Sequence, residues 1–327
     1  MRTFVTGGAG FIGSTLVDRL LRDGGEVVAF DNFDAFYAES RKRANLASAS
    51  NHPRFRLIEG DIRDRSLVHA SMRDVAPDVV VHLAARAGVR PSIEEPAVYA
   101  DVNVVGTVHL LEASCQLPRL PKFVYASSSS VYGDRPDAPF RETDSVDLPI
   151  SPYAASKKAC ELMAHTFHHL HGLPTTGLRF FTAYGPRNRP DLAIAKFTRL
   201  IDRGEPVPIF GDGSTRRDYT YIDDIVDGIV RSIQHCKQYH IYNLGNSAPI
   251  ELCEMVATIG AALGKTPILN RIPEQPGDVR QTYADVSLAE RDLGYAPRMP
   301  FIEGIARYVA WYRKEDQERS HIGSSDL

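Results

Sequence analysis

The stretch TFVTGGAGFIG, residues 3–13, decides the fold of this protein. It opens with a short apolar run, Thr3–Thr6, and continues with three evenly spaced glycines, Gly7, Gly10 and Gly13. Glycine permits a tight turn and the close approach of the backbone to a ligand. A helix that begins here points unpaired N–H groups and the positive end of its dipole at an anion. A glycine triplet between a first strand and a first helix therefore predicts a site for the pyrophosphate of a dinucleotide.

Short β-branched and aromatic runs recur through the first half of the chain and alternate with helical patterns. We expect strands at Thr3–Thr6, Val27–Phe30, Phe55–Ile58, Val79–Leu83 and Phe123–Ser127. Their near-continuous apolar character is typical of parallel strands that are covered on both faces. Strands joined by helices in this way predict right-handed crossovers and an α/β fold with a Rossmann-type, doubly wound parallel sheet.

The chain becomes less regular and richer in Pro and Gly clusters after about residue 175. A later apolar run, Ile241–Leu244, reads as a return strand of the first sheet. We therefore predict a dinucleotide-binding domain formed by residues 1–175 plus about 216–247. A smaller, interleaved α/β domain, about residues 176–215 and 248–327, is expected to bind the substrate.

The overall composition excludes several classes of protein. The 327 residues are 43% hydrophobic and 24% charged with a net charge of −3, as in a globular protein with a buried core. Because no run approaches about 18 apolar residues and strand structure starts at once, we expect no membrane helix and no signal peptide. The slight negative charge predicts no nucleic-acid partner. Four widely separated cysteines favour structural thiols in the reducing cytoplasm.

Two histidines of the later chain have a spacing that metal ligands use. His165 and His169 stand four residues apart, but no carboxylate or water-activation pattern accompanies them. A solvated helix face is the favoured interpretation, so we predict no metal site.

The second predicted strand ends at Asp31, 18 residues after Gly13. A carboxylate there can accept hydrogen bonds from a ribose 2′-hydroxyl and repels a 2′-phosphate. No arginine follows it before Arg41, so NAD is favoured over NADP. Asp61 and Ile62, after the third strand, are expected beside the adenine. The remaining predicted cofactor contacts, several of them small residues after the fourth strand, are Phe11, Ile12, Asn32, Leu83, Ala84, Ala85 and Phe180.

Tyr153 and Lys157 stand four residues apart, directly after Ser151 and Pro152, and proline suits the first turn of a helix. Residues at i and i+4 share a helix face, so the phenol and the ammonium group can address one site. A phenol is a poor base at neutral pH, but a nearby ammonium group and a positive nicotinamide ring stabilise the phenolate. Tyr153 is therefore a candidate general acid and base, and both residues are predicted to contact the cofactor.

A run of serines, Ser127–Ser130, ends the fifth predicted strand about 25 residues before the tyrosine–lysine pair. It supplies hydroxyl groups at the carboxyl edge of the sheet, where ligands bind in doubly wound folds. Without this context, a surface helix pair would be the more common interpretation of Tyr-x-x-x-Lys. With it, a catalytic site is favoured.

The glycine triplet, the serines before Val131-Tyr132-Gly133 and the Tyr153–Lys157 pair resemble the extended short-chain dehydrogenase/reductase family over nearly the whole chain. Further segments are similar to nucleotide-sugar epimerases, above all to UDP-glucuronate 4-epimerases. They are AGVR at 87–90, YGPRNRPD at 184–191, the stretch 211–221 with RRDY at 216–219, and PGDV at 276–279. The resemblance implies NAD as the cofactor and a UDP-sugar as the substrate.

The resemblance also implies how the catalytic residues act. Tyr153 removes the proton from the 4-hydroxyl of the sugar while hydride leaves C4 for NAD⁺. Lys157 binds the nicotinamide ribose, and Ser128 bonds the same sugar hydroxyl. The 4-keto sugar then turns over and takes the hydride back on its other face, so NAD is regenerated. UDP-glucuronate would in this way become UDP-galacturonate.

Ser129 and Ser130 separate this chemistry from that of related enzymes. The dehydratases that it resembles carry Asp-Glu directly before Val-Tyr-Gly, and the decarboxylases carry the Glu. Serine has no useful acid or base function unaided near neutral pH, so 4,6-elimination is disfavoured. A uronate oxidised at C4 is a β-keto acid that tends to lose CO₂, so an epimerase must hold its carboxylate in an unreactive orientation.

Several polar side chains are candidates for the sugar nucleotide. Arg187 and Arg189 offer donor forks that match a uronate carboxylate, with solvated loop charges as the alternative. The resemblance implies that Arg217 binds the diphosphate and that Asp278 accepts from the UDP ribose. Thr182 replaces an Asn found near the sugar in hexose epimerases, which favours a uronate. The predicted substrate contacts are Arg90, Ser128, Ser129, Thr182, Arg187, Arg189, Arg217 and Asp278.

Three other functions stay open at this point. They are a UDP-glucose or UDP-N-acetylglucosamine 4-epimerase, a UDP-glucuronate decarboxylase, and a non-enzymatic nucleotide-sensing module. The intact Tyr153–Lys157 pair argues against the module, because binding alone needs no phenolate. Related enzymes dimerise through the helix that carries this pair. The apolar stretch Ala154–Met163 allows the same homodimer here, although it could equally face its own sheet.

Overall fold

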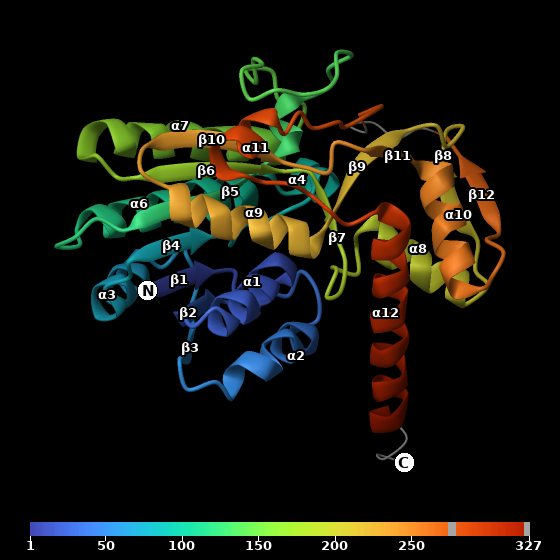
Figure 1. Ribbon diagram of the computed structural model, residues 1–327, viewed down its shortest axis with the longest axis horizontal. Coiled ribbons are helices and arrows are strands. Elements are labelled where there is room, and N and C mark those ends of the chain that lie inside the picture. The colour runs from blue at the N-terminus through green and yellow to red at the C-terminus, as the bar shows by residue number, and fades with distance from the viewer. Residues whose placement is uncertain (274–278, 324–327) are drawn as a thin grey trace.

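The computed structural model describes residues 1–273 and 279–323, and it consists of a large sheet covered by helices with a smaller lobe beside it (Figure 1). The large sheet has seven strands in the order β10-β6-β5-β4-β1-β2-β3. Every neighbouring pair is parallel. The strands are β1 (Arg2–Thr6), β2 (Glu26–Asp31), β3 (Phe55–Glu59), β4 (Val79–His82), β5 (Lys122–Ser128), β6 (Thr175–Phe180) and β10 (Tyr239–Leu244).

The predicted strands of the first half are all present, with ends that differ by a residue or two. The apolar runs form strands because the sheet buries them on both faces; all of β4 is buried, for example. The predicted return strand at Ile241–Leu244 is also confirmed, as the end of β10 beside β6. The strand order reverses between β1 and β4, so the predicted doubly wound sheet is confirmed.

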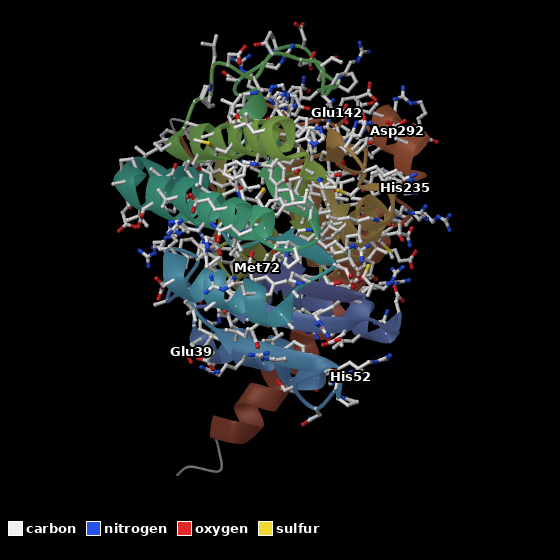
Figure 2. All side chains as sticks on the ribbon, turned by 90° about the vertical axis from the view of Figure 1, so that its left-hand side faces the viewer. Glu39, His52, Met72, Glu142, His235 and Asp292 are labelled. Carbon is white, nitrogen blue, oxygen red and sulfur yellow. The ribbon has the colours of Figure 1, made fainter. Side chains whose placement is uncertain are left out.

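Helices cover both faces of the large sheet. One layer contains α1 (Phe11–Arg22), α2 (Glu39–Ser50) and α9 (Ile222–His235). The other contains α3 (Arg65–Val75), α6 (Gly106–Cys115) and α7 (Pro152–His171). Figure 2 shows α7, α6 and α3 one above another, and Met72 of α3 is fully buried in this layer. Short elements that complete this half are α4 (Val89–Glu94), α5 (Pro96–Tyr99), the π-helix η1 (Ala100–Val105) and the 3₁₀-helix η2 (Ser129–Tyr132).

The smaller lobe is built from segments on both sides of β10, so the predicted interleaving is confirmed (Figure 1). Its sheets have the strand orders β11-β9-β7 and β12-β8. The strands are β7 (Thr182–Tyr184), β8 (Val207–Phe210), β9 (Arg216–Tyr221), β11 (Pro249–Glu251) and β12 (Leu269–Ile272). The helices are α8 (Ala193–Asp202), α10 (Leu252–Leu263) and α12 (Phe301–Gly323), whereas α11 (Ser287–Leu293) packs against α9 and β10 of the large half. Within the described residues, each helix is too short or too polar to cross a membrane.

Candidate active site

A cavity of about 420 Å³ opens at the carboxyl ends of the parallel strands, between the large sheet and the smaller lobe. The turn from β1 to α1, the segments that follow β2 to β5, and α7 form one side of it. Residues of the smaller lobe, Thr182, Ala183, Arg189 and Leu192, close the other side. Ligands of doubly wound folds bind at this edge of the sheet. Every predicted cofactor contact except Lys157 lines the cavity, as do Ser128, Ser129, Thr182 and Arg189.

Two glycines of the turn, Gly7 and Gly13, leave no room for a side chain. Gly7 has a φ of +69°, and a Cβ atom there would lie 2.7 Å from the backbone nitrogen of Ala84. A Cβ atom on Gly13 would lie 2.0 Å from the carbonyl oxygen of Gly7. The N-cap of α1, Gly10, offers no side-chain acceptor to the first N–H groups of the helix. This bare helix N-terminus at the cavity wall fits the pyrophosphate of NAD.

Asp31 is 7% exposed at the end of β2 and its carboxylate is held in place by the backbone. One oxygen accepts from the amide of Ala9 (3.0 Å) and the other from the amide of Phe33 (2.8 Å). Burial nevertheless raises the pKa of this carboxyl above its usual value. Lys42 of α2 lines the same part of the cavity, and its ammonium group donates to the carbonyl of Asp34 (2.7 Å). The carboxylate therefore faces the cavity beside a cation that balances it.

Helix α7 brings the tyrosine and the lysine to the cavity from one side. Ser151 caps the start of the helix, because its hydroxyl accepts from the amide of Ala154 (3.1 Å). Tyr153, in the first turn, lines the cavity. Lys157, one turn later, is 5% exposed and donates from Nζ to the carbonyl oxygen of Ala126 (2.9 Å). The lysine thus lies behind the cavity wall and fixes α7 to β5.

The serines divide between two sides of β5. Ser128 lies at the cavity, 8% exposed, and its hydroxyl oxygen accepts from the amide of Ser130 (3.1 Å). Ser127 sends its hydroxyl the other way, to a carboxylate oxygen of Glu161 in α7 (2.7 Å). Successive residues of a strand point to opposite faces, which explains the division. All of Ser127–Ser130 contribute to the cavity lining with Tyr153, but the hydroxyl of Ser127 is engaged by Glu161.

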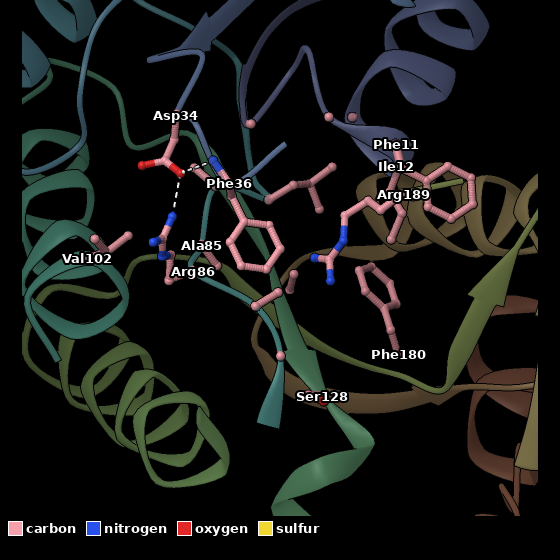
Figure 3. Close-up of a pocket in the computed structure, with 18 of the residues that line it drawn as sticks. Phe11, Ile12, Asp34, Phe36, Ala85, Arg86, Val102, Ser128, Phe180 and Arg189 are labelled. Carbon is pink, nitrogen blue, oxygen red and sulfur yellow. Dashed lines mark hydrogen bonds and ion pairs between the residues drawn. The ribbon is translucent and has the colours of Figure 1, made fainter. Parts of the chain in front are cut away.

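The two arginines of the 184–191 loop are placed differently. Arg189 lines the cavity and makes a two-pronged contact with Asp191 (3.1 and 2.8 Å). Figure 3 shows the ring of Phe36 between the guanidinium groups of Arg189 and Arg86, which lie 5.3 and 5.0 Å from the ring centre. Arg187 lies away from the cavity lining and pairs with Asp18 of α1 (2.7 Å). Of the two predicted carboxylate ligands, the geometry places only Arg189 at the cavity.

The other predicted substrate contacts lie farther out. Arg90 of α4 stacks over the ring of Phe210 in β8, with 4.9 Å between them. Arg217 of β9 donates to the carbonyl of Arg216 (2.9 Å). Neither residue is part of the cavity lining. Asp278 lies outside the described residues.

Known proteins with similar sequences belong to a family of dinucleotide-dependent nucleotide-sugar enzymes, in agreement with the cavity described above. The profile of the GDP-mannose 4,6 dehydratase family matches residues 4–308 of the chain. A probable UDP-glucuronate 4-epimerase from Rhizobium meliloti is 39% identical, over 98% of this chain and 99% of the relative. The protein belongs to the extended short-chain dehydrogenase/reductase family.

Solved structures place it among the nucleotide-sugar enzymes of that family. A UDP-glucuronic acid 4-epimerase from Bacillus cereus, solved with UDP-glucuronic acid and NAD, superposes with a TM-score of 0.90 at 34% identity, over 96% of this chain and 99% of the other. A UDP-glucose 4-epimerase from Thermotoga maritima, solved with UDP-glucose, gives a TM-score of 0.88 at 34% identity, with the same coverage. The family resemblance inferred from the sequence is confirmed.

The motifs of the family do not cover the whole cavity lining. The loop after β2 contributes Asp34, Phe36 and Tyr37, α2 contributes Lys42, and the segment after β4 contributes Arg86. Arg86 forms an ion pair with Asp34 that joins these two segments across the cavity (Figure 3). In the sequence, only their position directly after predicted strands points to these residues. Residues that directly follow parallel strands gather at the ligand-binding edge of the sheet.

Proposed function

We propose that this protein is an NAD-dependent UDP-sugar 4-epimerase that converts UDP-glucuronate to UDP-galacturonate. The observation that carries the proposal is that Tyr153, Ser128 and the glycine turn face one cavity. The similarity to UDP-glucuronate 4-epimerases over nearly the whole chain supports the same conclusion.

Bound NAD supplies the acceptor of the C4 hydride and then returns it. The phenolate of Tyr153 takes the proton of the sugar 4-hydroxyl and later gives it back. Because Ser128 already accepts a hydrogen bond from the amide of Ser130, its own O–H is left to donate to the sugar oxygen. Lys157 lies behind the cavity lining and uses one N–H on the carbonyl of Ala126, which leaves two donors for the nicotinamide ribose, the contact that the family resemblance implies.

The 4,6-elimination of a dehydratase needs further proton transfers, for which Ser129 and Ser130 offer no acid or base, whereas loss of CO₂ from the β-keto acid is limited by how the carboxylate is held. Ser129 and Ser130 occupy the positions that carry carboxylates in the dehydratases that the sequence resembles. Ser129, Ser130 and Ser128 line the cavity as neutral hydroxyl groups. The 4-keto sugar therefore meets no carboxylic acid at this wall, and return of the hydride is the outcome that the site favours.

Arg189 is the residue we propose for the uronate carboxylate, because its donor fork faces the cavity. A second candidate function follows from the ion pairs that the two arginines of this loop already form. Arg189 already holds Asp191, and Arg187 already holds Asp18. A site whose arginines are satisfied internally also suits a neutral sugar, so a UDP-glucose 4-epimerase is the alternative.

Turnover of the purified protein with no added cofactor tests the proposal. UDP-glucuronate and UDP-glucose are supplied separately, and the products are separated by chromatography. We expect UDP-galacturonate as the main product, with a higher kcat/KM for the uronate. A preference for UDP-glucose would establish the alternative, and release of CO₂ with UDP-xylose would show a decarboxylase instead.

We also propose a homodimer in the cytoplasm. Helix α7 exposes Leu162, Met163 and Leu170 by 57%, 39% and 66%, a stripe that a second copy of the helix could cover. All four cysteines are free thiols, which suits a reducing compartment. Light scattering after size-exclusion chromatography tests the dimer. The division into residues 1–175 with 216–247 and residues 176–215 with 248–327 also remains a proposal; β9, at the start of residues 216–247, pairs with β7 and β11 in the sheet of the smaller lobe.

A further inference from the structure

A buried ion pair lies behind the wall of the cavity and takes no part in the chemistry described above. Glu161 of α7 and Arg179 of β6 are 1% and 2% exposed. Two parallel hydrogen bonds join them, Nε to Oε1 (2.8 Å) and Nη2 to Oε2 (2.9 Å). Burying two charges costs so much desolvation that such a pair adds little net stability. Its presence here therefore calls for a role other than stability.

The pair is connected to the catalytic strand by a third group. The hydroxyl of Ser127 in β5 donates to Oε1 of Glu161 (2.7 Å). One helical turn earlier, Lys157 donates to the carbonyl of Ala126 (2.9 Å). Two successive residues of β5 are thus fastened to two successive turns of α7, immediately before Ser128 reaches the cavity.

The spacing on α7 links the position of Tyr153 to these contacts, because the tyrosine is on the helix that they hold. Tyr153, Lys157 and Glu161 stand at i, i+4 and i+8 and share one face of the helix. Eight residues correspond to about 12 Å of helix, so the two fixed points define the axis along which Tyr153 is carried. A guanidinium fork fixes both the position and the rotation of a carboxylate, which a single hydrogen bond does not.

Arg179 also supports the turn that follows the serines. Its guanidinium carbon lies 4.8 Å from the ring centre of Tyr132, at the end of η2. The hydroxyl of Tyr132 donates to Oδ1 of Asn243 in β10 (2.7 Å). Burial raises the pKa of Tyr132 to about 12, so its hydroxyl stays a neutral donor near neutral pH. The arginine thus joins α7, β6 and the η2 turn in one buried network.

We propose that Glu161 and Arg179 are positioning residues that, through Ser127, hold α7 in register on β5 and β6 and so align the phenol of Tyr153 with the hydroxyl of Ser128. The proposal rests on the proposed epimerase chemistry, because alignment matters for a proton transfer between these groups and the sugar. A displacement of about 1 Å at reacting atoms can cost about a hundredfold in rate. The expected signature is a loss of kcat with binding preserved.

The triple variant Ser127→Ala, Glu161→Met, Arg179→Met tests the proposal. It removes the buried ion pair and the Ser127 hydroxyl together, so that neither charge is left buried alone; Lys158, which lies 3.7 Å from Oε2 of Glu161, is 22% exposed and stays in contact with solvent, so we expect the fold to be preserved. We expect kcat to fall about a hundredfold, while KM and the NAD content of the purified protein stay within about threefold of wild type. The control replaces the Asp227–Arg231 pair of α9, 2.5 Å apart, by Leu and Met and retains kcat.

Wild-type kcat in the folded triple variant would overturn the proposal. A fall in kcat matched by a loss of NAD or an equal rise in KM would also overturn it, because that pattern indicates general structural damage. If the triple variant does not fold, Ser127→Ala and Ser127→Thr decide the question. We expect about fivefold lower kcat for alanine, and recovery with threonine, which restores the hydroxyl. The assay uses whichever UDP-sugar the wild type turns over, so an error in the proposed substrate leaves this test intact.

Discussion

Replacing Arg189 by methionine should weaken the binding of a uronate and leave that of a neutral sugar unchanged. Arg189 faces the cavity, and its side chain is 19% exposed. Hydrogen bonds to a charged group contribute about 1.5–3 kcal/mol. To bind the uronate, Arg189 must give up its ion pair with Asp191, which is 40% exposed, and the loss of this exposed pair costs about 0.2–1 kcal/mol. The remainder, about 0.5–2.8 kcal/mol with a midpoint near 1.7 kcal/mol, corresponds to a rise in KM of about 2- to 100-fold, with about 15-fold as the central value.

Steady-state kinetics with UDP-glucuronate and UDP-glucose measure this difference directly. The matched control is Arg187→Met, two residues earlier in the same loop. Because Arg187 pairs with Asp18 on α1 and lies away from the cavity lining, we expect its KM values to change less than about threefold. Equal effects of Arg189→Met on both substrates, or a larger effect of Arg187→Met on the uronate, would refute the reasoning.

Three further predictions concern the cofactor, the buried histidine and the dimer. Gly13→Ala places a Cβ atom 2.0 Å from the carbonyl oxygen of Gly7, so the turn must shift and the purified variant should carry little NAD; a normal NAD content would contradict this. Burial lowers the pKa of His82 from 6.5 to about 3 in the folded protein. Between these two pH values the histidine is protonated in the unfolded chain but not in the folded one. The free energy of unfolding therefore falls as the pH drops from 6.5 towards 3. About 1.4 kcal/mol should be lost by about pH 5.5, measured by urea unfolding, and the loss should be absent in His82→Gln. Leu162→Glu on α7, where the leucine is 57% exposed, should give a monomer by light scattering, and an unchanged mass would disprove the proposed interface.

The parts of the site that the sequence predicts are those encoded by local spacing. Gly7, Gly10 and Gly13 restrict the backbone to one kind of turn, and Tyr153 and Lys157 share a helix face wherever that helix lies. The doubly wound arrangement of the sheet also follows, because right-handed crossovers leave few arrangements of alternating strands and helices. These features need no knowledge of distant contacts.

The remaining parts depend on contacts between distant segments. Arg86 and Asp34 come together only because the segments after β2 and β4 end at the same sheet edge. Arg187 and Arg189 cannot be distinguished by residue type. The backbone directs the two side chains to different places, because Arg187 has a φ of +66°. This left-handed conformation is uncommon for a residue other than glycine and cannot be predicted from the sequence here.

The central claim is that the phenol of Tyr153 moves the proton at C4 while bound NAD holds the hydride. Tyr153→Phe removes one oxygen atom and keeps the ring that contacts Tyr99 edge-on, with 6.2 Å between the ring centres. The measurement is kcat for the UDP-sugar together with the NAD content of the same preparation. We predict a normal NAD content with kcat reduced by about a hundredfold to ten-thousandfold. Epimerisation at the wild-type rate by this variant would contradict the account.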